Sequence, residues 1–111
     1  MKKTDSLSKT KNYQQVYKFG RSKSCRILVM VVRKNETERN RLGISVSKKV
    51  GNSVIRHRIT RLIRESYRLH EEMLSSGLDI VVIARNPAKD ASYYEVEEAL
   101  LYLAKLHKIR V

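Results

Sequence analysis

A chain of 111 residues, 41% of them hydrophobic, suffices for one modest core, so we expect a single domain over residues 1–111. Its 24 Lys and Arg against 11 Asp and Glu give a formal net charge of +13, which favours a polyanionic partner over a generic soluble role. One cysteine excludes an intramolecular disulfide, and no membrane-spanning run or secretory signal is present, so we expect a cytoplasmic protein without a membrane partner.

The first predicted element is a short helix that begins at residue 8 or 10 and ends at Gly20. Tyr13 and Tyr17 are four residues apart and share one of its faces. They suit either core packing or stacking on the bases of a single strand, whereas Phe19 beside them is expected in the core. Four basic residues near the two tyrosines favour stacking on single-stranded bases: Lys9, Lys11, Lys18 and Arg21.

Two strands are predicted next. Residues 26–33 are rich in β-branched side chains, and residues 42–47 alternate between apolar and small or polar ones. The polar stretch 34–40 between them has the composition of a turn. We therefore expect these two strands to pair as an antiparallel hairpin.

The second half of the chain predicts a helix, a strand and a last helix. Residues 51–53 offer a cap for a helix from about Val54 to His70, and the apolar run 80–84 is typical of a buried strand. Ser92 and Glu95 have capping-box spacing. The side chains expected to face inward from the last helix are Ala99, Leu100, Leu103 and Leu106. The resulting fold class is a single-domain α/β sandwich of order α-β-β-(β)-α-β-α.

The helix predicted over 54–70 has two contrasting sides. At 100° per residue, one stripe gathers the side chains expected to face the core: Ile55, Ile59, Leu62, Ile63 and Ser66. The remaining arc carries the arginines Arg56, Arg58, Arg61, Arg64 and Arg68. Residues 1–68 hold 19 Lys and Arg against 4 Asp and Glu, so this charge is not balanced locally. Arginine binds phosphate through a planar fork and stays charged, which predicts a phosphate-binding face.

Catalytic patterns are missing from the sequence. The histidines His57, His70 and His107 are far apart, without a second His or Cys at metal-ligand spacing, and the glycines form no phosphate loop. We therefore expect no catalytic residue, no metal site and no cofactor held by the protein alone.

The segment around Arg56-His57-Arg58 carries a family resemblance. It is preceded by the run 42–52, which contains Lys48, Lys49 and Asn52, and followed by Arg61-Leu-Ile-Arg-Glu65. This segment resembles the signature of the bacterial ribonuclease P protein, in which the middle residue of the Arg-x-Arg motif is usually Asn. The resemblance extends over nearly the whole chain, including 13–20 and 79–88.

The resemblance implies a protein subunit that supports a catalytic RNA in removing the 5′ leader of precursor tRNA. The RNA would perform the endonucleolytic chemistry with Mg²⁺ bound mainly by the RNA. The residues expected to meet the RNA subunit are Lys48, Lys49, Asn52, Arg56, His57, Arg58, Arg61, Arg64 and Arg68. A groove between the first helix and the sheet would bind the leader through Tyr13, Tyr17, Lys18 and Arg21.

The same resemblance implies a left-handed strand–helix–strand crossover for the arginine-rich helix, whereas general topology favours a right-handed one. The alternative function is a ribosomal protein or general RNA chaperone, which shares the small size and basic charge. A DNA-binding regulator is not expected, because a strand stands where a helix–turn–helix partner is needed.

Overall fold

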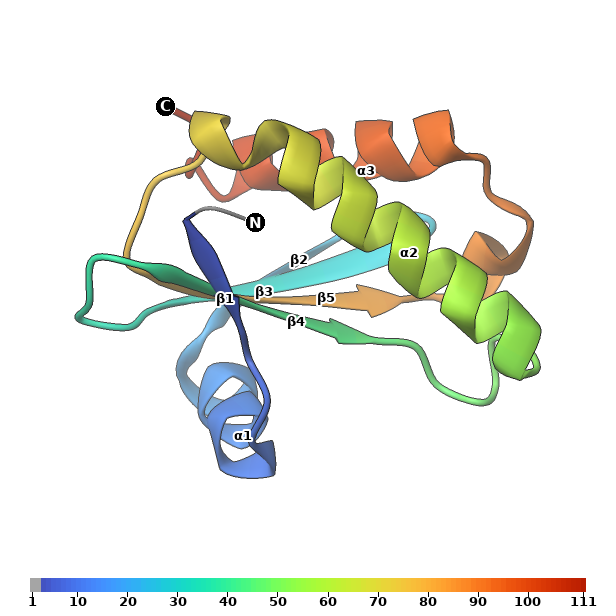
Figure 1. Ribbon diagram of the computed structural model, residues 1–111, viewed down its shortest axis with the longest axis horizontal. Helices are drawn as coiled ribbons and strands as arrows, with labels where there is room; N and C mark the ends of the chain where they lie inside the picture. Colours follow the sequence, from blue (N-terminus) through green and yellow to red (C-terminus); the bar gives the residue numbers. More distant parts are fainter. Residues whose placement is uncertain (1–2) are drawn as a thin grey trace.

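A five-stranded mixed sheet forms the middle layer of the computed structural model, which describes residues 3–111 (Figure 1). Met1 and Lys2 lie outside the described residues. The elements follow the order β1 (Thr4–Ser6), α1 (Thr10–Phe19), β2 (Arg21–Ser24), β3 (Leu28–Lys34), β4 (Asn40–Ser45), α2 (Ser53–His70), β5 (Leu78–Ala84) and α3 (Tyr93–Leu106), with short 3₁₀ helices at Glu71–Met73 and Asn86–Asp90. The order in the sheet is β1-β4-β5-β3-β2.

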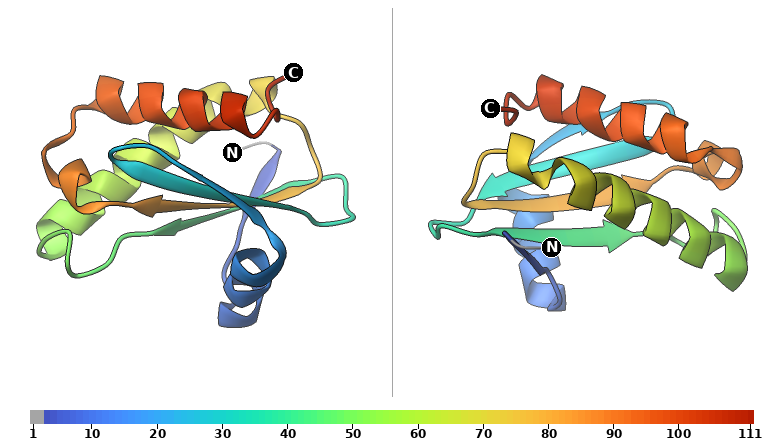
Figure 2. Two further views of the ribbon diagram at one scale, coloured as in Figure 1. Left: turned by 180° about the vertical axis from the view of Figure 1, so that it is seen from behind. Right: turned by 45° about the horizontal axis from the view of Figure 1, so that its top comes forward.

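Helices cover both faces of the sheet. Helices α2 and α3 lie side by side on one face and α1 lies alone on the other (Figures 1 and 2). The larger apolar cluster is enclosed between the sheet and the α2–α3 layer, whereas a small one joins Val16 of α1 to Val31 and Val81. The predicted α/β sandwich is confirmed, with β2 as its third strand before α2. The added strand β1 was not predicted.

The predicted hairpin of β3 and β4 is wrong. The two strands run in opposite directions but do not pair, because β5 lies between them, antiparallel to β3 and parallel to β4. The composition of β5 explains its central place: Ile80, Val81 and Val82 are all completely buried, so both faces of the strand need cover. Burial of this apolar run outweighs the general preference of consecutive strands for pairing.

The crossover β4-α2-β5 is left-handed. Viewed with α2 in front of the sheet and the two parallel strands pointing up, β5 lies to the left of β4, as Figures 1 and 2 together allow the reader to follow. A right-handed crossover would place β5 at the other edge of β4. That edge is occupied by β1, which pairs with β4 from Thr4↔Asn40 onward.

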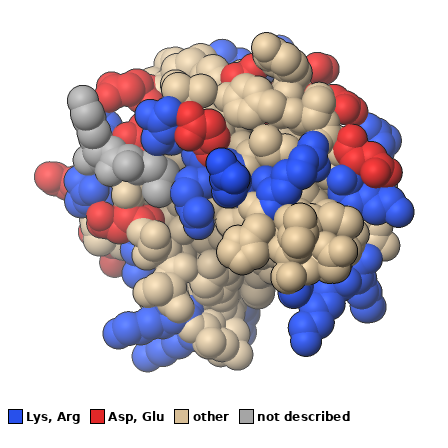
Figure 3. All heavy atoms as spheres, turned by 45° about the vertical axis from the view of Figure 1, so that its right-hand side comes forward, with Lys and Arg blue, Asp and Glu red and all other residues tan. Residues whose placement is uncertain are grey.

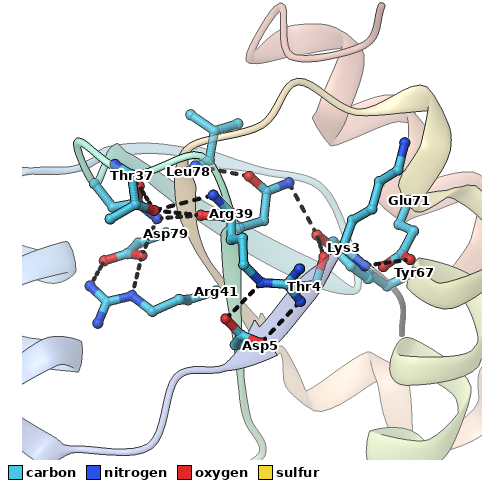
Figure 4. A network of polar contacts seen from close by, with 12 residues as sticks. Lys3, Thr4, Asp5, Thr37, Arg39, Arg41, Tyr67, Glu71, Leu78 and Asp79 are labelled. Atoms are coloured by element: carbon cyan, nitrogen blue, oxygen red, sulfur yellow. Dashed lines mark hydrogen bonds and ion pairs between the residues drawn. The ribbon is translucent and has the colours of Figure 1, made fainter.

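A buried polar network closes the end of the sheet where β4 and β5 begin (Figure 4). The hydroxyls of Tyr67 and Thr4 lie 2.9 Å apart, and Asn40 accepts a hydrogen bond from the backbone N–H that begins β5. Asp79, only 2% exposed, accepts two hydrogen bonds from Arg41, at 2.7 and 2.6 Å. These contacts join β1, β4, β5 and α2, and nothing in the local sequence pattern pointed to them.

Local signals for the helices are largely confirmed. The Asn52 side chain accepts a hydrogen bond from the backbone N–H of Ile55, and Ser92 with Glu95 forms a complete capping box. The prediction that Leu106 faces the core is wrong, since it is 38% exposed. Ile109, which is buried, fills this end of the core after the chain reverses at the end of α3.

Candidate nucleic-acid interface

Helix α2 separates its apolar and basic sides as the sequence predicts. Ile59, Ile63 and Ser66 are completely buried, and Ile55 and Leu62 are partly buried against the same core. Lys48 and Lys49 are exposed in the turn that leads into the helix. In Figure 3 Lys and Arg side chains extend across the middle of the view, and most acidic side chains lie toward its edges. The helix therefore presents a basic surface anchored by an apolar one.

The arginines of α2 differ in how they are held. Within residues 3–111, Arg61 and Arg64 are exposed and have no hydrogen-bonding or ion-pair partner for their side chains. Arg68 pairs with Glu65, at 2.5 and 3.2 Å. Arg58 donates to the backbone carbonyl of Ala91 at 2.5 Å and more weakly to that of Lys89, so it links α2 to the segment before α3.

The three side chains of the motif Arg56-His57-Arg58 have different surroundings in the structure. Arg56 is half-buried, and its Nε has no hydrogen-bond partner in the described part of the chain. His57 is exposed, and Arg58 donates hydrogen bonds to backbone carbonyls. Arg61 and Arg64 are consequently the arginines of α2 that are most available to a phosphate.

The two tyrosines of α1 lie beside the sheet face opposite α2. Their ring centroids are 6.3 Å apart, with Tyr13 half-buried and Tyr17 46% exposed. Burial raises the pKa of the Tyr13 phenol, and the neighbouring Tyr17 raises it further, so Tyr13 stays neutral. Tyr13 rests on Gly43 of β4, where a Cβ would come within 2.7 Å of the ring. The phenol end of Tyr13 therefore packs on the backbone at Gly43, and Tyr17 extends the aromatic surface into solvent.

Phe19 was expected in the core, and that prediction is wrong because its side chain is 58% exposed. Lys18 Nζ and the guanidinium carbon of Arg33 each lie 5.3 Å from the centroid of its ring. Cation–π contacts of this kind stabilise an exposed aromatic ring. One feature of the sequence could have indicated this exposure: Phe19 stands directly before Gly20, where the helix ends. It adds an aromatic side chain with basic neighbours to the surface of α1.

Arg21 is not brought together with the tyrosines. It pairs with Val32 across β2 and β3, and directly paired residues point to the same face of a sheet. Val32 belongs to the core under α2 and α3, so Arg21 faces that side, where it lines a hollow with His107. Lys18 is exposed on α1 and remains on the side of the tyrosines.

Over residues 3–111 no three His, Cys, Asp or Glu side chains are grouped so that they could hold a metal ion. None of the helices in that range is both long enough and apolar enough to cross a membrane.

Comparisons with known proteins agree over nearly the whole chain. The family model described as Ribonuclease P matches residues 1–108. The ribonuclease P protein component of Lachnoclostridium phytofermentans is 58% identical over 106 residues, which cover 96% of this chain and 91% of that protein. The structure of the Staphylococcus aureus RNase P protein superposes with a TM-score of 0.88 at 39% identity, covering 96% of this chain and 97% of the other. The Thermotoga maritima RNase P protein gives 0.84 at 31% identity, covering 92% and 96%.

Proposed function

The chain belongs to the ribonuclease P protein family, whose role is the removal of the 5′ leader of precursor tRNA together with an RNA subunit; from this premise we propose which of its surfaces meet which RNA. The basic side of α2 binds the RNA subunit, and the aromatic surface of α1 beside the sheet binds the leader. The family assignment gives no support to the alternative of a ribosomal protein or general RNA chaperone.

One observation carries the assignment of α2: Arg61 and Arg64 are exposed and have no partner within residues 3–111, on a helix whose opposite side packs on the core. Unpaired arginines one turn apart can each grip a phosphate bidentately. Lys48 and Lys49 extend the positive surface from the preceding turn. Such a surface suits the backbone of a structured RNA, for which counterion release supplies much of the affinity.

The proposal for the leader rests on the aromatic surface of α1. Tyr17 and Phe19 are exposed, and Lys18 lies between them in the chain. Aromatic side chains in basic surroundings hold single-stranded bases without strong sequence preference, as a leader of variable sequence requires. Because Arg21 lies on the other face of the sheet, Lys18 and Arg33 are the better candidates for leader phosphates.

The chemistry belongs to the RNA subunit in this proposal, and the protein is a non-catalytic subunit of the endoribonuclease. The Mg²⁺ of the reaction is assigned mainly to the RNA, as the family resemblance implies. The protein contributes binding energy and orientation.

Reconstitution tests this proposal. The chain is mixed with a candidate ribonuclease P RNA and labelled precursor tRNA at a low Mg²⁺ concentration, beside the RNA alone as the reference. We expect cleavage at the mature 5′ end with both components present. The protein alone, at high purity, is expected to yield no product, and metal-dependent cleavage that survives nuclease treatment of the preparation would overturn the assignment of chemistry to the RNA.

A further inference from the structure

A hollow of about 470 Å³ opens between α2 and the start of α3. Its volume lies within the range of about 300–1,000 Å³ that is usual for small-molecule sites. The lining combines three arginines with one acidic, one aliphatic and one aromatic side chain: Arg58, Arg61, Leu62, Arg64, Glu65 and Tyr93. The aromatic ring adds a surface for stacking on a base, which contacts with phosphates alone do not use.

Tyr93 forms a fixed aromatic wall of the hollow. Its hydroxyl donates to Glu97 at 3.3 Å, and its ring contacts Tyr94 edge-on with centroids 5.8 Å apart. The ring is half-buried, and Leu62 beside it is partly buried against the core. The ring is held at its hydroxyl and at one side, so it is already oriented before binding. A base that stacks on it therefore causes little further loss of conformational entropy in this side chain.

The charged members of the lining divide into committed and available groups. Glu65 is paired with Arg68, and Arg58 donates to backbone carbonyls. Arg61 and Arg64 are left without a partner in the part of the chain that the structure describes. The hollow thus combines an aromatic ring, on which a base can stack, with two available guanidinium groups, which can bind a phosphate. A single nucleotide carries both a base and a phosphate.

We propose that this hollow binds one unpaired nucleotide of an RNA, with the base against Tyr93 and its phosphate between Arg61 and Arg64. The inference rests on the proposed binding of RNA by α2 and makes it more specific, because a base stacked within a duplex is not free to enter. Tyr93 is then a specificity-determining residue for an RNA that offers an unpaired nucleotide at this position.

The test compares variants of the whole protein in binding the ribonuclease P RNA at several salt concentrations. Tyr93→Ala and Tyr93→Leu should weaken binding about 5- to 150-fold, the equivalent of the ~1–3 kcal/mol that one stacked base contributes. Tyr93→Phe should retain most of the affinity. The dependence of affinity on salt should stay unchanged in all three, because no phosphate contact is removed. Tyr93→Leu keeps an apolar side chain at the site, so its thermal unfolding checks that a loss is not due to misfolding.

Tyr102→Ala is the matched control, since Tyr102 lies on the same helix, is 50% exposed and does not line the hollow. It should bind like the unmodified protein. If Tyr93→Leu also binds normally while Arg61→Ala flattens the salt dependence, the nucleotide site is refuted and the binding of RNA by α2 stands. If Arg61→Ala also changes nothing, the proposed role of α2 fails as well.

Discussion

Arg61→Ala and Arg64→Ala are expected to weaken RNA binding without weakening the fold. Both side chains are exposed and lack partners within residues 3–111, so truncation removes no intramolecular hydrogen bond or ion pair and relieves repulsion. For Z phosphate contacts, the logarithm of affinity falls with the logarithm of salt with a slope of roughly −0.7Z to −0.9Z. Each variant should therefore flatten that slope by roughly 0.7 to 0.9, and the double variant by roughly twice as much.

Two further variants on the same helix serve as contrasts. Ile59 is completely buried, and Ile59→Ala should lower the unfolding free energy by about 2–5 kcal/mol while the folded protein keeps the normal salt slope. Arg58→Ala loses its contact with the Ala91 carbonyl and should cost about 1–2 kcal/mol of stability.

The assay is titration of the RNA subunit with each variant at several salt concentrations, beside urea unfolding of the free protein. An unchanged slope for Arg61→Ala and Arg64→Ala would show that these arginines do not meet phosphate. A loss of stability as large as that of Ile59→Ala would show that they are structural residues instead.

Three other expectations follow from the sheet and its two faces. Tyr17→Ala should weaken holoenzyme binding of leader-bearing precursor tRNA by ~1–3 kcal/mol and leave affinity for mature tRNA unchanged; equal losses for both ligands would contradict stacking on the leader. Gly43→Ala places a Cβ within 2.7 Å of the Tyr13 ring and should displace it, lowering stability by about 1–3 kcal/mol and leader affinity with it, while the salt slope for the RNA subunit is unaffected. Burial, aided by nearby positive charges, lowers the pKa of His107 from its ordinary 6.5, so the unfolded chain binds the proton more readily. The unfolding free energy should therefore fall as the pH drops below about 6.5, and urea unfolding of His107→Gln should show a weaker dependence on pH in that range; an equal dependence in both proteins would contradict the burial of His107.

Local signals in the sequence determined the helices and the basic surface. The cap at Asn52 and the capping box at Ser92 involve residues three positions apart, so their geometry depends on the adjacent backbone alone. The two sides of α2 follow from the helical period, which assigned Ile59 to the core and Arg61 to solvent before any neighbour was known. The family resemblance in the segment around Arg56-His57-Arg58 added the left-handed crossover that general topology opposes.

Only the tertiary structure decided which strands are neighbours and which face each side chain of β2 takes. The position of β5 between β3 and β4 depends on competition among distant segments for burial, and the register of β2 determines that Arg21 faces His107 rather than the tyrosines. The exposure of Phe19 likewise depends on where α1 ends over the sheet. Local periodicity does not specify which strands pair or in which register. The register matters because a shift by one residue turns every side chain of a strand to the opposite face of the sheet.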